Sequence, residues 1–199
     1  GTPARLADAV EMGMNMVRVW GGGLYESEEF YDACDRLGLL VWQDFAYGCS
    51  YYPDGPKEQE IAEKEALANI KRLRNHPSLA LWCGNNENLT MFHSAWGGNE
   101  NRPPRYYGEN LYNLAIPKAL AAADPSRPYI DSSPTGGDHA NSDGFGDQHY
   151  WDVWHGRGDW RHYVDSGARF CSEFGFISSQ GLDGWGECLA VGDDGADTP

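Results

Sequence analysis

The sequence is poor in basic residues and has no long apolar run. Its 199 residues include 15 Lys and Arg against 30 Asp and Glu, which gives a formal net charge of −15. A surface of that sign repels a phosphate backbone, so we expect no nucleic-acid partner. No apolar run reaches membrane-spanning length and no signal-peptide pattern opens the sequence, so we expect no membrane partner either. The cellular compartment stays open.

Patterns that bind metals or nucleotides are also missing. The five cysteines show no CxxC spacing, and two lie within predicted strands, so buried thiols are favoured over a disulfide framework. His93, His139 and His162 lack HExxH spacing, the glycines at 21–23 lack the Rossmann and P-loop spacings, and the carboxylates at 138–147 lack the EF-hand order. We therefore expect no metal and no cofactor, with surface positions for the three histidines.

Aromatic residues are abundant, with 8 Trp and 11 Tyr. Flat apolar side chains of this kind stack on sugar rings, although some of them also serve an ordinary core. The composition is thus compatible with a carbohydrate-binding protein.

The most informative stretch is the apolar run at 79–82 and the polar residues after it. The run is typical of a short buried strand. Gly84 then leads into two side-chain amides, Asn85 and Asn86, and the carboxylic acid Glu87. These groups can bind sugar hydroxyls and exchange a proton, although Asn-Asn-Glu alone also suits an ordinary polar turn.

A second predicted strand ends in the same way. Residues 169–175 carry Glu173 into a turn that Gly175 closes. Two carboxylic acids at the ends of two strands are the minimum requirement of a glycosidase. The repetition favours a catalytic interpretation of Glu87 and Glu173 over a pair of polar turns.

The order of predicted elements indicates a parallel α/β fold. Helices and strands alternate, and polar residues follow the carboxyl ends of the strands. Functional groups at the ends of many strands are typical of a (β/α)8 barrel, whereas a doubly wound sheet, the competing interpretation, concentrates its site at one switch point. Strands are predicted at 15–20, 39–44, 79–82, 129–133, 148–151 and 169–175, and helices at 2–13, 27–38, 58–74, 106–123 and, weakly, 185–189.

Five segments resemble a known family in sequence and in order. They are Arg-Val-Trp-Gly-Gly-Gly at 18–23, Trp-Gln-Asp-Phe at 42–45, the His-Pro-Ser to Asn-Asn-Glu segment at 76–87, His-Tyr-Trp at 149–151 and Phe-Cys-Ser-Glu-Phe-Gly at 170–175. They are similar to the catalytic barrel of β-mannosidases in glycoside hydrolase family 2, from Thr2 to about Ser179. The resemblance implies that residues 1–199 are a partial (β/α)8 barrel domain holding strands 2 to 7. The flanking β-sandwich domains would lie outside the chain, and the rest of a parent enzyme would complete the barrel.

The resemblance also implies a retaining mechanism. Glu173 matches the nucleophile and Glu87 the acid/base, so the substrate would be a β-mannoside or a manno-oligosaccharide that loses its terminal β-D-mannose. Arg18 would keep Glu173 ionised by lowering its pKa, and apolar neighbours such as Trp82 or Trp96 would raise the pKa of Glu87.

The same resemblance supplies candidates for sugar binding. Asn86 would bind the 2-hydroxyl, Trp20 would line the −1 subsite, and Asp44 would bind a sugar hydroxyl unless it forms a plain interior ion pair with Arg18. Tyrosine often holds the nucleophile in related barrels; here Trp151 occupies that position, so His155 is a candidate for the contact. The complete set of expected substrate-binding residues is Arg18, Trp20, Asp44, Asn86, Trp96, His149, Trp151 and His155.

Two alternatives remain open from the sequence. One is a family 2 relative that acts on a glucuronide, galactoside or glucosaminide. The other is a barrel remnant that binds sugar without cleaving it. The sequon Asn88-Leu-Thr90 is interpreted as chance, since a glycan beside Glu87 would obstruct the pocket.

Overall fold

The computed structural model describes residues 2–176, which form two compact units. The first unit comprises residues up to 149 together with 167–172. The second comprises 150–166 and, among the described residues, 173–176. Within residues 2–176, no helix has both the length and the apolar character needed to cross a membrane.

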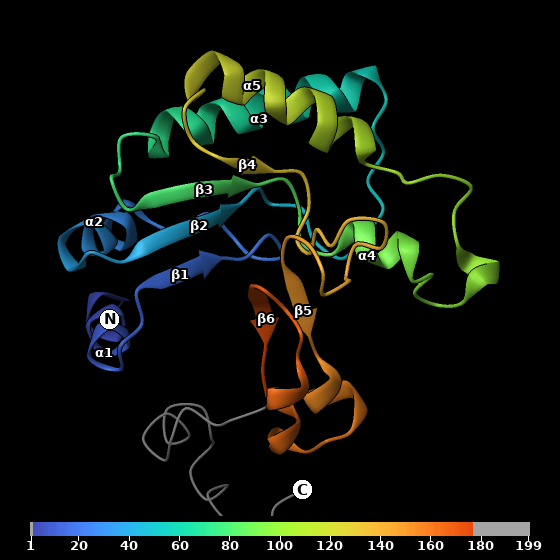
Figure 1. The fold of residues 1–199 in the computed structure, drawn as a ribbon. Coiled ribbons are helices and arrows are strands. Elements are labelled where there is room, and N and C mark those ends of the chain that lie inside the picture. Colours follow the sequence, from blue (N-terminus) through green and yellow to red (C-terminus); the bar gives the residue numbers. More distant parts are fainter. Residues whose placement is uncertain (1, 177–199) are drawn as a thin grey trace, which may run out of the picture. The chain divides into compact units, whose positions relative to one another are not determined.

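A four-stranded parallel sheet forms the centre of the first unit (Figure 1). Its strands lie in chain order and all three pairings are parallel. The first four predicted strands and the parallel α/β class are thereby confirmed, although the fourth strand is shorter than expected. The strands are β1 (Met16–Val19), β2 (Leu40–Asp44), β3 (Leu79–Cys83) and β4 (Tyr129–Ile130).

Helices connect these strands, as parallel pairing requires. The predicted helices correspond to α1 (Thr2–Glu11), α2 (Glu28–Leu37), α3 (Pro56–Leu73) and α5 (Ile116–Ala123), the last preceded by a π-helical turn, η2 (Leu111–Ala115). Gly38 closes α2 in the left-handed region with φ 72°, as expected of a C-terminal glycine. In the first unit, two short helices were not predicted from the sequence, α4 (Asn88–His93) and η1 (Asn99–Asn101).

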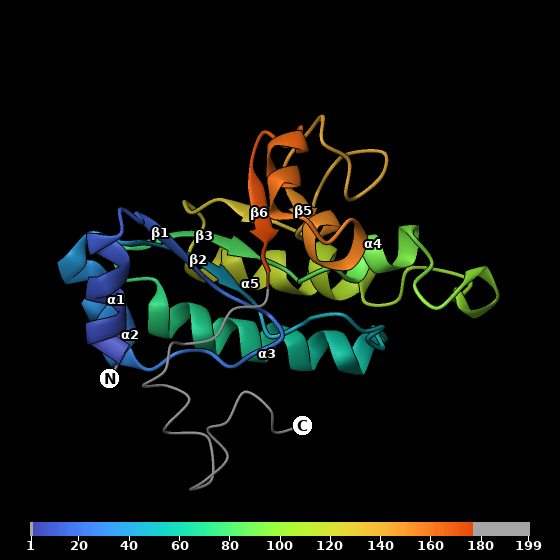
Figure 2. The same cartoon turned by 90° about the horizontal axis from the view of Figure 1, so that it is seen from below.

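The core lies between the sheet and its helices. Val17 and Val19 alternate with Arg18 along β1, and both valines pack in this core. The predicted apolar stripe of α3 is buried, and α3 and α5 lie side by side against the sheet (Figures 1 and 2). Arg18 pairs in register with Trp42, so these two side chains project from the opposite face. The stripe consists of Ala62, Ala66, Ile70 and Leu73.

The last two predicted strands form a sheet of their own within residues 2–176. They are β5 (Gln148–Tyr150) and β6 (Cys171–Phe174), and each crosses the boundary between the two units. A hydrogen bond from the Gln148 amide to the Phe170 carbonyl (2.9 Å) lies beside them in the first unit. The described residues thus divide the six expected strands into sets of four and two.

The second unit contains two short helical turns, η3 (Asp152–Gly156) and η4 (Trp160–Asp165). Arg157 lies between them and forms ion pairs with Asp152 and Asp165. The weak helix expected at 185–189 lies outside the described residues, as does Cys188. Of the other cysteines, Cys34 and Cys83 are buried, Cys171 is partly buried and Cys49 is exposed. The expectation of buried thiols in the strands is confirmed for Cys83 and not for Cys171.

Candidate active site

An ion pair between neighbouring strands begins the site. The Arg18 guanidinium on β1 donates to both carboxylate oxygens of Asp44 on β2, at 3.2 and 2.7 Å. The Gly21 amide (2.9 Å) and the Trp42 indole (2.8 Å) donate to the same carboxylate. A carboxylate has about four acceptor positions, so all of those of Asp44 are occupied. This favours the interior ion pair, and a sugar hydroxyl could reach Asp44 only by replacing one of these donors.

Asn86 extends the network to the next strand. The Arg18 guanidinium donates to Asn86 Oδ1 at 2.9 Å. Asn86 forms parallel bridges to Gly48 on one side and Ser133 on the other, so the backbone ladder continues past the named strands. The side-chain amide of Asn86 therefore has its oxygen bound and its NH₂ group available to donate, in part to Cys49 Sγ at 3.4 Å.

Glu87 comes next in the chain, and its backbone conformation is one that residues other than glycine rarely adopt. Its φ is 63° and its ψ is 1°, in the left-handed region, which costs on the order of 1–2 kcal/mol for a residue with a Cβ atom. Two backbone hydrogen bonds hold it there: its amide donates to the Ser133 carbonyl (2.7 Å), and its carbonyl accepts from the Met91 amide (2.8 Å) in α4. The turn between β3 and α4 thereby fixes the direction of the Glu87 side chain.

The Glu87 carboxyl is buried against a histidine. Its Oε1 lies 2.7 Å from His149 Nδ1, and its Oε2 accepts from the Cys49 thiol at 3.4 Å. The side chains of His149 and Glu87 are 1% and 11% exposed. Among the expected residues of the first unit, the structure brings together Arg18, Asp44, Asn86, Glu87 and His149.

The expected raised pKa of Glu87 is wrong for this structure. Burial does raise the pKa of this carboxyl, but the hydrogen bond and charge of His149, the Cys49 thiol and the charge of Arg18 outweigh burial, and the net pKa is lowered. Trp82, one of the two apolar neighbours expected to raise it, is fully buried on the helix side, where its indole donates to Asp124 at 2.9 Å.

Behind His149 lies a further buried carboxylate, Asp147, that the sequence analysis did not single out. His149 Nε2 is 3.0 Å from Ser133 Oγ, which lies 2.7 Å from Asp147 Oδ2. Asp147 also accepts from the Thr135 amide (2.8 Å) and from the Ser172 hydroxyl. Ser133 is fully buried, and Asp147 and His149 nearly so.

The second unit holds the other expected carboxylic acid. The Trp151 indole donates to Glu173 Oε2 at 3.3 Å, so the residue at the expected tyrosine position itself contacts Glu173. His155 is exposed and its ring lies against those of Trp151 and Trp154. The proximity of Glu173 to Glu87 and to Arg18 stays a prediction.

Two expected aromatic residues are partly open to solvent in the first unit. Trp20 is 48% exposed beyond the end of β1, and Trp96 is 45% exposed in the segment after α4. Such exposed indoles can stack on a sugar ring, but the network of Arg18 and Glu87 described above does not include them.

Of the neighbouring amides, Asn85 and Asn88 are structural. Asn85 bonds the Tyr106 hydroxyl (3.2 Å) and the Asp131 carbonyl (2.8 Å), and Asn88 bonds the Tyr112 hydroxyl (2.7 Å). Both are fully buried. A glycan cannot attach to a side chain in this position of the folded chain, which agrees with the sequon being a chance match.

Sequence reasoning missed Cys49, Ser133 and Asp147. Ser133 carried a usable signal, because it ends the predicted strand at 129–133, as Glu87 follows the one before. Asp147 immediately precedes a predicted strand, where carboxylates carry no particular expectation. Cys49 lies in an irregular loop with φ 47°, and no pattern indicates its contact with Glu87.

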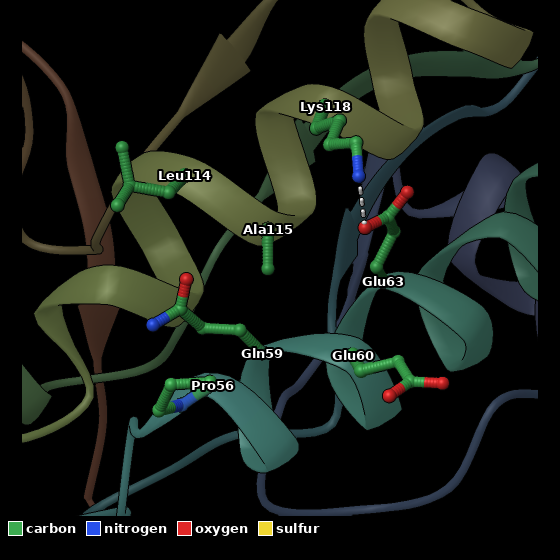
Figure 3. A pocket seen from close by; sticks show the side chains of 7 residues that line it. All are labelled: Pro56, Gln59, Glu60, Glu63, Leu114, Ala115 and Lys118. Carbon is green, nitrogen blue, oxygen red and sulfur yellow. Dashed lines mark hydrogen bonds and ion pairs between the residues drawn. The ribbon is translucent and has the colours of Figure 1, made fainter.

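A separate pocket of about 330 Å³ lies between α3 and the η2–α5 helix (Figure 3). Gln59, Leu114 and an ion pair between Lys118 and Glu63 (2.7 Å) line it. These residues belong to the helices, whereas Arg18 and Asp44 project from the opposite face of the sheet. The pocket therefore does not belong to the site.

Comparison with known proteins identifies similar sequences. No family model matches the chain. The chain is 45% identical over 175 residues to β-mannosidase B of Emericella nidulans and 42% identical over 170 residues to that of Aspergillus clavatus, covering 80% of this chain and 20% of each relative. A crystal structure of β-D-mannosidase from Dictyoglomus thermophilum matches with a TM-score of 0.84 and 46% identity, over 89% of this chain and 22% of that one.

The resemblance to β-mannosidases is thereby confirmed. The chain spans about a fifth of the length of these relatives. A β-glucuronidase of Bacteroides uniformis matches with a TM-score of 0.60 at 17% identity, over 84% of this chain and 21% of that one. At that identity the likeness concerns the fold alone. Identity to the β-mannosidases is thus more than twice as high as identity to this relative.

Proposed function

We propose that this chain is part of the catalytic domain of a retaining exo-β-mannosidase, which releases terminal β-D-mannose from β-mannosides or manno-oligosaccharides. The observation that carries the proposal is the 46% identity and TM-score of 0.84 to a β-D-mannosidase over 89% of the chain. The cluster that joins Arg18 on β1 and His149 on β5 with Asn86 and Glu87, which follow β3, supports it.

We further propose that the six strands are strands 2 to 7 of a (β/α)8 barrel. Four parallel strands in chain order, with helices packed along one face, fit one half of such a barrel. Polar side chains at the carboxyl ends of β1 to β4 fit its catalytic face. Strands contributed by the rest of a parent enzyme would close the barrel and cover edges that otherwise favour aggregation.

The proposed reaction has two displacements. Glu173 attacks the anomeric carbon while Glu87 gives a proton to the leaving oxygen. Glu87 then takes a proton from water as water displaces Glu173. The Trp151 indole orients Glu173 through the observed hydrogen bond. A retaining pair requires carboxyl groups about 5–5.5 Å apart, which a crystal structure of the full-length protein would measure.

Substrate recognition would use the amide of Asn86. Its oxygen is held by Arg18, so its NH₂ group is oriented to donate to the 2-hydroxyl, the axial group that distinguishes mannose from glucose. Trp20 and Trp96 would stack on the sugar, and His155 would border the pocket beside Trp151.

The test is hydrolysis of p-nitrophenyl β-mannoside by the natural protein that contains this chain, beside the glucuronide, galactoside and glucosaminide. We expect cleavage of the mannoside with retained configuration. Preference for another sugar would contradict the substrate, and binding without turnover would indicate a non-catalytic remnant. The 199 residues alone should be inactive and poorly soluble or oligomeric; an active monomer would contradict the incomplete barrel.

A further inference from the structure

A chain of buried hydrogen bonds connects Glu87 with Asp147. It runs from Glu87 Oε1 to His149 Nδ1 (2.7 Å), from His149 Nε2 to Ser133 Oγ (3.0 Å), and from Ser133 Oγ to Asp147 Oδ2 (2.7 Å). All four residues belong to the first unit. The contacts of Asp147 and Ser133 have no part in the mechanism proposed above.

The chemistry of the groups sets the direction of the bonds. An ionised carboxylate only accepts, so the Ser133 hydroxyl gives its single proton to Asp147. The Ser133 oxygen can then only accept from His149 Nε2, which must carry a hydrogen. This arrangement is reinforced because a hydrogen bond to a charged acceptor is about twice as strong as a neutral one.

One neighbour opposes this direction. Arg18 Nη1 lies 3.5 Å from His149 Nε2, and a guanidinium can only donate. An unprotonated Nε2 would suit Arg18, whereas a protonated Nε2 suits Ser133. The Ser133 contact is shorter, at 3.0 Å against 3.5 Å for Arg18 Nη1. The shorter contact decides in favour of a protonated Nε2.

We propose that Asp147 and Ser133 are positioning residues that keep His149 Nε2 protonated, so that Nδ1 is the ring atom that shares a proton with Glu87. The role of that proton rests on the proposed function, in which Glu87 is the acid/base. Side chains of the first unit that contact this pair include Arg18 on β1, Cys49 after β2 and Ser133 after β4. Asp44 and Asn86 in turn bind Arg18, and Asp147 binds Ser133.

The arrangement lets Glu87 act in both steps. A proton between Nδ1 and Oε1 leaves either a carboxylic acid beside neutral imidazole or a carboxylate beside imidazolium. In the first displacement, Glu87 protonates the glycosidic oxygen as its bond to the anomeric carbon breaks. In the second, Glu87 removes a proton from water as the oxygen of water bonds to that carbon and the bond to Glu173 breaks. The pair ends the turnover with the protons it had at the start.

Neutron diffraction from crystals of the natural protein that contains this chain tests the proposal without any need for activity. Deuterium should be present on His149 Nε2. An unprotonated Nε2, with deuterium on Nδ1 alone, would overturn the proposal. Ser133→Ala removes the oxygen that accepts this proton, while Arg18 Nη1, which can only donate, still lies 3.5 Å from Nε2, so the deuterium occupancy of Nε2 should fall. A Nε2 that stays protonated in this variant would show that Ser133 does not determine the tautomer.

Kinetics provide a second readout. Asp147→Asn and Ser133→Ala should lower kcat by at least about tenfold for mannosides with poor leaving groups, a part of the ~10²–10⁴-fold that general acids contribute. Mannosides with good leaving groups, which need no proton, should be nearly unaffected. Equal loss for both kinds of substrate would indicate a structural role and contradict the proposal.

A matched control separates loss of a buried hydroxyl from loss of the tautomer. The Ser132 hydroxyl is also fully buried, and it donates to Asn85 Oδ1 at 2.9 Å without contacting His149. Ser132→Ala should leave deuterium on Nε2 and should not discriminate between leaving groups. If the natural protein cleaves no mannoside at all, the proposed function fails, while the neutron result still decides the tautomer.

Discussion

The two faces of the four-stranded sheet bury their side chains by different physical means. On the helix side, residues such as Val17, Val41 and Ile70 pack in an apolar core, where stability grows with the area removed from water. On the other face, Arg18 and Asp44 are 13% and 0% exposed, and each has its hydrogen bonds supplied by neighbours. The stability of the helix side thus depends on how well its apolar volume is filled. The stability of the other face depends on a partner for every buried polar group.

The difference sets how each face responds to substitution. Removing methyl groups from an apolar core leaves a cavity, and the cost depends on how well the surroundings relax. Removing one member of a buried polar network leaves its partner unpaired, and the cost falls on the partner. Partner substitutions should therefore rescue variants of the polar face and not variants of the helix side.

The largest expected effect concerns the two carboxylic acids. Glu173→Ala should abolish turnover of all β-mannosides, since no covalent intermediate can form. Glu87→Ala should lose about 10²–10⁴-fold for poor leaving groups but still react with good ones, and azide should partly restore its turnover. Steady-state kinetics on aryl mannosides of graded leaving-group quality measure this in the natural protein that contains the chain.

Folding controls belong with these assays. Ile70→Ala, on the helix side, should lower the free energy of unfolding. Any loss of turnover in this variant should be the same for good and poor leaving groups. Equal losses for Glu87→Ala and Glu173→Ala on every substrate, with no response to azide, would show that Glu87 is structural.

The next effect is on stability. Arg18→Met leaves the Asp44 carboxylate buried without its cation, which should cost about 3–5 kcal/mol in the free energy of unfolding measured in urea. Arg18→Met combined with Asp44→Asn should recover part of this loss, because no uncompensated charge remains.

An exposed ion pair provides the contrast to Arg18. Lys64 and Glu60 on α3 are 73% and 66% exposed, so Lys64→Met should change stability little. If Arg18→Met were equally mild, or if the double substitution recovered nothing, the dependence of this face on complete pairing would be refuted.

The sequence predicted the helix side better than the polar face. Periodicity identified the Ala62 to Leu73 stripe and the alternation of Arg18 with Val17 and Val19, because these patterns follow from local geometry. Strand ends also pointed to Glu87 and Asn86. The structure has a strand, β1, and a helix, α3, at the first two places, and Asn86 and Glu87 follow the end of β3.

Sequence named the Arg18–Asp44 ion pair as one possibility, but it did not predict the other pairs across long separations. Asp147 reaches Glu87 only through Ser133 and His149, and none of these contacts leaves a periodic trace. The direction of the Glu87 pKa shift depends on the same contacts. An apolar environment was expected, yet His149, 62 positions along the chain, supplies a polar one. The left-handed backbone at Glu87 is likewise held in part by a long-range hydrogen bond, from its amide to the Ser133 carbonyl, that no local pattern contains.

A third effect is the response to acid. The pKa of Glu87 is lowered in the folded chain: burial raises it, but His149, Cys49 and Arg18 lower it more. A group whose pKa is depressed on folding contributes stability above its unfolded pKa, about 4.3 for glutamate, and loses it as pH falls through the folded value. Glu87→Gln should therefore flatten the loss of stability below about pH 4 in urea titrations of the natural protein that contains this chain, relative to the same protein without the substitution.

The helix side again supplies the comparison for acid. Ile70→Ala should lower the free energy of unfolding by about 2–5 kcal/mol at every pH and leave the slope with pH unchanged. An identical pH slope in the Glu87→Gln variant and in the unsubstituted natural protein would mean that Glu87 has the same pKa folded and unfolded.

The smallest expected effect is at Cys49. Its thiol donates to Glu87 Oε2 at 3.4 Å and accepts from Asn86 Nδ2 at 3.4 Å, and a thiol is a weak partner in both roles. Cys49→Ala should raise the pKa of Glu87 slightly and change the free energy of unfolding by less than about 1 kcal/mol. Cys49→Ser supplies a stronger donor and should shift the acid response in the opposite direction. Urea titrations across the acid range compare the three side chains. If Cys49→Ala and Cys49→Ser shift the acid response in the same direction, Cys49 acts on Glu87 by packing and not by its hydrogen bond.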